Sequence, residues 1–161
     1  MQSDLANYHG SLIGVAYRIT GDMESAKDVV QDTYVAALKP DNAFSGFSSL
    51  KTYLYRIVIN KSIDVKRHWK RRLSMLGGIL AEPSGTESTL LDEIDRKNLV
   101  RKLLCKVPDE FRIPLVLAEV DGMSYAEIAE TLHISLNTVR TRIFRAREKF
   151  RKELKRMGGV S

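Results

Sequence analysis

The chain has 161 residues, enough for one or two small domains, and no apolar run approaches the roughly 20 residues of a membrane-spanning helix. Its N-terminus lacks the basic-then-apolar pattern of a signal peptide, and a single cysteine, Cys105, excludes an intramolecular disulfide and a thiolate zinc cage, so we expect a cytoplasmic protein without a metal site. The net charge of +6 is uneven, because residues 56–72 carry +6 and residues 140–156 carry +7. Two such segments favour two contacts with a polyanion over two solvated helix faces.

Helical periodicity without strand alternation predicts an all-α fold. The first helix is expected over about Asp4–Thr20. Gly21 then ends it, and Asp22 caps a second helix over about Met23–Lys39. The positions expected to face the core of these two helices are Leu5, Leu12, Ile13, Ala16, Ile19, Ala26, Val29, Val30, Thr33, Tyr34 and Ala37.

The next segment combines a loop with a long helix. Pro40–Ser49 predicts a loop, and it contains two phenylalanines, Phe44 and Phe47. A helix is expected over about Leu50–Arg72, apolar in its first half and basic in its second.

Aromatic residues are interleaved with the cations of this helix. Tyr53, Tyr55 and Trp69 alternate with Lys and Arg, a pattern that suits unstacked bases and a single-stranded backbone. The alternative, that Tyr53 and Tyr55 belong partly to the core, is equally open. Trp69 stands among charged residues, where an apolar ring has no obvious core to join.

Glycine, proline and serine then interrupt the helical pattern over residues 74–88, which predicts a linker. We therefore expect two small helical domains, at residues 1–73 and 89–161. The second begins with an amphipathic segment in which Cys105 is expected to be a small core residue. Pro108 and Asp109 mark a break and a cap before a helix over Glu110–Val120.

Residues 122–152 predict a short helix, a tight turn and an arginine-rich second helix. Glu127 follows Ser124 at the capping-box spacing, and residues 133–135 form the turn, with Ser135 as the second cap. This is the pattern of a helix-turn-helix whose second helix enters a DNA major groove. The residues expected to face inward from that helix are Val139, Ile143, Ala146 and Phe150.

The opposite face of the second helix predicts DNA contact, since arginine suits guanine and asparagine suits adenine. The residues expected to contact the duplex are Ser135, Asn137, Thr138, Arg140, Thr141, Phe144 and Arg145. Cations further along, at Arg147, Lys149, Arg151 and Lys152, are better placed for phosphates. Arg142 falls beside the apolar stripe, where we expect it to pair with an acid of its own domain. For any single arginine, plain solvation is the alternative.

Two stretches of the chain resemble the bacterial sigma factors of the extracytoplasmic-function (ECF) class. Region 4 of that family is similar to LCKVPDEFRIPLVLAEVDGMSYAEIAETLHISLNTVRTRIFRAREKFRKEL, and region 2 is similar to YRITGDMESAKDVVQDTYVAALK and FSSLKTYLYRIVINKSIDVKRHWKRR. Together they cover nearly the whole chain except the linker. Tyr53 stands where the family usually has tryptophan, and Phe144 where histidine is common.

The resemblance implies roles for the first domain. The polar positions that match the surface docking on the clamp helices of the RNA polymerase largest subunit are Asp28, Gln31 and Asp32. Without the resemblance they would be an ordinary acidic helix face. The loop with Phe44 and Phe47 corresponds to the one that pockets a base flipped from the −10 element. The positions expected to hold the displaced strand are Arg56, Asn60, Lys61, Asp64 and Arg67, with Trp69 as an added ring.

The function implied is that of a promoter-specificity subunit, not an enzyme, with no cofactor. It would bind the clamp helices and flap of core RNA polymerase, read a −35 duplex and help melt a −10 element, and an anti-sigma factor is an expected partner. Two alternatives use the residues alone: a stand-alone helix-turn-helix regulator that binds a palindrome as a dimer, and an all-α protein–protein adaptor. The three histidines are scattered, which argues against a catalytic site.

Overall fold

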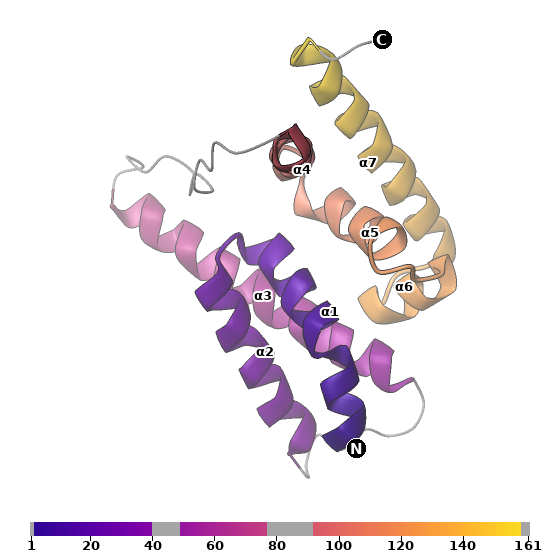
Figure 1. Cartoon of the computed structure of the whole chain (residues 1–161). Helices are drawn as coiled ribbons and strands as arrows, with labels where there is room; N and C mark the ends of the chain where they lie inside the picture. The colour runs from indigo at the N-terminus through magenta and orange to yellow at the C-terminus, as the bar shows by residue number, and fades with distance from the viewer. Residues whose placement is uncertain (1, 40–48, 77–91, 159–161) are drawn as a thin grey trace. The chain divides into compact units, whose positions relative to one another are not determined.

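The computed structural model describes residues 2–39, 49–76 and 92–158, and their regular structure is entirely α-helical, as predicted (Figure 1). The chain divides into two compact units, residues 1–85 and 86–161. The helices are α1 (Gln2–Thr20), α2 (Met23–Leu38), α3 (Leu50–Met75), α4 (Asp92–Cys105), α5 (Asp109–Glu119), α6 (Tyr125–Leu132) and α7 (Leu136–Arg156). None of these helices is long and apolar enough to cross a membrane.

The first unit is a three-helix arrangement in which α1, α2 and α3 each contact the other two (Figure 1). Its core is built from one apolar stripe per helix, with Leu12, Val30, Leu54 and Val58 fully buried. Tyr55 is also buried, so the structure decides for the core interpretation of that ring.

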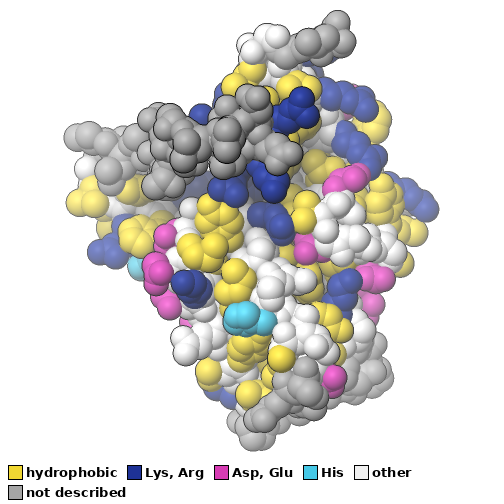
Figure 2. All heavy atoms as spheres, viewed as in Figure 1, with side chains coloured by type: hydrophobic (Ala, Val, Ile, Leu, Met, Phe, Trp, Pro, Cys, Tyr) yellow, Lys and Arg dark blue, Asp and Glu magenta, His cyan; other side chains and the backbone are white. Residues whose placement is uncertain are grey.

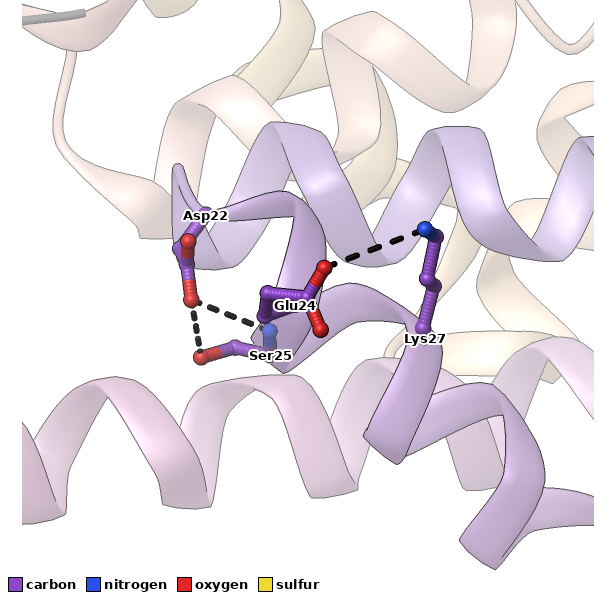
Figure 3. A network of polar contacts seen from close by, with 4 residues as sticks. All are labelled: Asp22, Glu24, Ser25 and Lys27. Carbon is purple, nitrogen blue, oxygen red and sulfur yellow. Dashed lines mark hydrogen bonds and ion pairs between the residues drawn. The ribbon is translucent and has the colours of Figure 1, made fainter.

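The turn between α1 and α2 is held by Asp22 (Figure 3). Gly21 takes a φ of 76°, a left-handed conformation that glycine adopts without a steric cost. The Asp22 carboxylate then accepts hydrogen bonds from the hydroxyl of Ser25 at 2.7 Å and from its backbone N–H at 3.0 Å. These bonds favour the ionised form and lower the pKa of Asp22. One turn of helix on, Lys27 and Glu24 form an ion pair at 3.8 Å.

Helix α3 extends beyond the core that supports it. Its N-cap is Ser49, whose hydroxyl accepts from the N–H of Thr52 at 3.1 Å. The buried residues of α3 end at Ser62, and none of residues 63–76 is buried. The helix nevertheless continues to Met75, so Ser74 and Met75, which we expected in the linker, are helical. Phe44, Phe47 and most of the expected linker lie outside the described residues.

The second unit packs α7 against α4, α5 and α6. Two sequence expectations are wrong here. Cys105 is exposed, because the neighbouring positions Leu103 and Val107 point into the core and leave the residue between them on the outer side. Asp109 is the first residue of α5 and not its cap, which is Pro108 without a side-chain hydrogen bond. Asp109 instead pairs with Arg112, whose side chain is largely buried.

We expect the Asp22→Ala variant to lose about 1 kcal/mol of unfolding free energy at neutral pH, because two bonds to Ser25 disappear. Since the folded-state pKa is lowered, the contribution is complete above the ordinary carboxyl pKa and is lost as the pH falls through the folded value. Urea unfolding followed by circular dichroism between pH 7 and about pH 3 measures both effects. The Asp22→Asn control keeps an uncharged cap, so its difference from the parent should vanish in acid. Equal stability of Ala and Asp at pH 7 would contradict this role.

Candidate nucleic-acid interface

The helix-turn-helix of α6 and α7 is defined by its caps. Ser124 accepts a hydrogen bond from the N–H of Glu127 at 3.1 Å, and Ser135 accepts one from Thr138 at 3.1 Å. Between them His133 adopts a left-handed conformation, with φ 55° and ψ 46°, and its N–H bonds the carbonyl of Ala129. Both predicted caps are therefore present, and the left-handed residue turns the chain between the two helices.

One side of α7 is fixed by burial. Val139, Ile143 and Ala146 are fully buried, and Phe150 is partly buried, as their spacing predicted. This stripe packs on α5 and α6, so the remaining sides of the helix meet solvent. Lys and Arg side chains follow α7 along the surface in Figure 2.

The residues expected to contact DNA lie together on the solvent sides of α7 and at its N-cap. Thr138 is half-buried. The exposed residues are Ser135, Asn137, Arg140, Thr141, Phe144 and Arg145. Polar contacts link the first turns, since Thr141 donates to the carbonyl of Asn137 at 3.0 Å and Arg140 donates to the Asn137 side chain at 3.4 Å. Phe144 is 62% exposed among them.

The flanks of α7 carry cations that pair within the unit. Arg142 lies 3.7 Å from Glu110, which confirms that it pairs with an acid of its own domain. Arg147 donates to Glu119 at 2.6 Å. That hydrogen bond raises the pKa of Arg147. We expected Arg147 at a phosphate, and only the folded structure brings Glu119, 28 residues earlier in the chain, to its guanidinium.

A second polar surface runs along α3. Arg56, Asn60, Asp64 and Arg67 recur every three or four residues and so form a single stripe, opposite the buried side of the helix. Arg56 is half-buried and the other three are exposed; Lys61, also half-buried, lies at the edge of this α3 stripe.

Trp69 lies apart from the α3 stripe. It follows Ser62 by two helical turns and is therefore on the same side of α3 as the buried residues, but beyond the end of the core. Its ring is 51% exposed, and the Arg72 guanidinium lies 5.7 Å from the ring centroid, in a cation–π contact. Trp69 is thus beside a cation, as the sequence pattern indicated, but on a different side of α3 from the α3 stripe.

Helix α2 offers a third surface. Asp28, Gln31 and Asp32 are all exposed on one side, opposite the buried residues Ala26 to Ala37. Sequence analysis missed Val35, which lies one turn further along the same side and is 55% exposed. The signal was present, because Val35 is an apolar residue out of phase with the buried stripe.

The three surfaces carry groups that are suited to binding. Within the described ranges, no group of three or more His, Cys, Asp or Glu side chains could hold a metal ion. Cations, amides, hydroxyls and exposed rings are the groups with which proteins contact phosphates and bases.

Comparison with known proteins assigns both units. Residues 5–72 match the family model for Sigma-70 region 2, and residues 97–150 match that for Sigma-70, region 4. The chain is 31% identical over 160 residues to the ECF RNA polymerase sigma factor SigW of Bacillus subtilis, with 92% of this chain and 85% of that protein covered. It is 35% identical over 133 residues to the ECF RNA polymerase sigma-E factor of Escherichia coli K12, with 75% of this chain and 69% of that protein covered.

Solved structures agree. The sigma factor RpoE from Bartonella quintana, in complex with the anti-sigma factor NepR, superposes with a TM-score of 0.78 at 25% identity over 96% of both chains. CnrH, in complex with the cytosolic domain of CnrY, gives a TM-score of 0.68 at 32% identity, with 95% of this chain and 86% of CnrH covered. With regions 2 and 4 in order and relatives matched over most of their length, the chain belongs to the ECF RNA polymerase sigma factors.

Proposed function

We propose that this sigma factor binds core RNA polymerase and directs initiation by reading a −35 duplex with α7 and opening a −10 element with its first unit. One observation carries the proposal. Burial of Val139, Ile143 and Ala146 leaves the polar and basic residues of α7 exposed at the N-terminal half of the second helix of a helix-turn-helix. That half is where such helices meet base edges in a major groove.

For the −35 element, we assign base contacts to the first three turns of α7. Arg140 and Arg145 suit guanine O6 and N7, and Asn137 suits adenine. Ser135, Thr138 and Thr141 supply hydroxyls, but the helix caps and backbone already engage them, so we assign them to phosphates or sugars.

For the −10 element, we assign the displaced strand to the α3 stripe. Arg56 and Arg67 meet its phosphates, with Lys61 at the edge, while Asn60 and Asp64 offer hydrogen bonds to bases. The Trp69–Arg72 pair, which lies beyond the core, would make a separate contact with the displaced strand. We assign the pocket for a flipped base to Phe44 and Phe47, which lie outside the described residues.

For polymerase, we assign the exposed side of α2. Asp28, Gln31 and Asp32 would dock on the clamp helices, and Val35 would add an apolar contact at one end. We place region 2 at 1–73 and region 4, which would also meet the flap, at 89–161. The linker expected at 74–88 is shortened at its start by Ser74 and Met75, which continue α3.

We propose that this initiation factor is cytoplasmic and non-catalytic and that an anti-sigma factor is a further partner. The support is that two structurally similar proteins were solved with partners, RpoE with an anti-sigma factor and CnrH with a cytosolic domain. The family membership disfavours a stand-alone regulator and an adaptor.

Addition of the purified chain to core RNA polymerase tests the proposal as a whole. Sequencing the 5′ ends of transcripts made from genomic DNA should give starts that share one upstream pair of −35 and −10 elements and that vanish when either protein is omitted. Binding to DNA by the chain alone, without core-dependent initiation, would favour the stand-alone regulator and reject a sigma function.

The Arg140→Ala and Arg145→Ala variants test the −35 contacts. Each should lower initiation from a cognate promoter by about tenfold or more, the loss of one bidentate base contact, and should leave core binding intact. Run-off transcription measures the first quantity and co-migration with core on gel filtration the second. Initiation equal to the parent in both variants would show that α7 does not read the −35 element.

Phe144 should contact a thymine methyl group, because its exposed ring is apolar and its neighbours face the duplex. Replacing thymine with deoxyuracil at each −35 position in turn should identify one position where loss of the methyl lowers parental initiation by about fourfold. The Phe144→Ala variant should be insensitive to that same replacement, whereas Phe144→Leu should retain part of the sensitivity. If no position affects the parent, or if Phe144→Ala responds equally, the assignment is wrong.

A further inference from the structure

Arg147 differs from the other exposed cations of α7 in having a close acidic partner on another helix. Its Nη2 lies 2.6 Å from Oε1 of Glu119, the last residue of α5. A single side chain on α7 therefore bonds to the end of α5.

The other flank of α7 carries a matching contact. Arg142 pairs with Glu110, the second residue of α5, at 3.7 Å. Glu110 and Glu119 are nine residues apart in the sequence, so the two pairs are separated by about 13 Å along α5. The buried stripe holds α7 on α5, and these two contacts at opposite ends of α5 add resistance to a change in the angle between the two helices.

Such pairs are poor candidates for a stabilising role. All four side chains are partly exposed, and exposed ion pairs contribute little to folding free energy. The pairs are better suited to orienting α7, since a guanidinium hydrogen bonded to a carboxylate has a defined position.

On the basis of the proposed −35 function, we propose that Glu119 and Arg147 are positioning residues that help to set the angle at which α7 enters the −35 major groove. Arg147 then acts through α5 and needs no phosphate contact of its own. Base contacts at Arg140 and Arg145 depend on this angle, because a small displacement removes bidentate geometry.

The Glu119→Gln variant distinguishes a positioning role from a simple charge effect. If attraction to phosphates is all that matters, removing the acid should strengthen binding to any DNA sequence and leave sequence discrimination intact. If Glu119 positions α7, the variant should lose sequence discrimination. We measure the holoenzyme on two templates, one with the −35 element and one with that element scrambled, and take the ratio of initiation rates. For Glu119→Gln and for Arg147→Ala the ratio should fall by up to about fivefold, the limit set by the small free energy of a partly exposed ion pair.

Arg151→Ala is the matched control, because it removes an equal charge one turn further along α7, from a side chain that is exposed. It should lower initiation on both templates and leave their ratio unchanged, as expected of a phosphate contact. The exchanged pair Arg147→Glu with Glu119→Arg should recover part of the ratio lost in either single variant. Thermal unfolding of each variant should stay close to the parent.

An unchanged or increased ratio for Glu119→Gln would overturn the proposal, as would Arg147→Ala behaving like Arg151→Ala. Failure of the exchanged pair to recover any discrimination would also count against it. A parental ratio of one has a different meaning: α7 then does not read a −35 element, and the proposed function fails before the variants are compared.

Discussion

The packing of α7 on its neighbours is the constraint on which the second unit depends. Val139, Ile143 and Ala146 are short enough to let the helices approach closely and fully buried once they have done so. This choice of buried side leaves nearly all the charge of the helix in solvent, where residues 140–156 carry nine cations and two acids. Repulsion among these cations would destabilise the helix in isolation, and packing of its apolar stripe on the neighbouring helices stabilises it.

In the first unit, two helices likewise bury one apolar side and expose a charged or polar side. Helix α3 buries one stripe, from Thr52 to Ser62, and presents its polar stripe on the opposite side. Helix α2 does likewise, but its exposed side is acidic where that of α3 is basic. One small core therefore supports two surfaces of opposite charge, and unlike partners such as a protein and a nucleic acid strand can be bound by one unit.

Sequence analysis predicted what depends on local physics. Helix periodicity, the Asp22, Ser124 and Ser135 caps and the inward stripe of α7 are all set by residues within a turn or two of each other. It failed where distant contacts, or the direction of a single side chain, decide. The partner of Arg147 comes from another helix. The exposure of Trp69, by contrast, agrees with the expectation that its ring has no core to join. Cys105 lay in an apolar segment, yet its position between two core residues turns it outward.

The end of α3 that extends beyond the core also links the folding of the first unit to the binding of a polyanion. Residues 66–72 place five cations and a histidine on a little under two turns of helix, and none of them is buried. Mutual repulsion opposes helix formation there, and a bound polyanion would neutralise it. Because α3 is one continuous helix, that relief reaches the core residues from Leu54 to Ile59. On the proposed −10 function, the melting temperature of the first unit should therefore rise with the concentration of single-stranded DNA and fall back as salt displaces the strand.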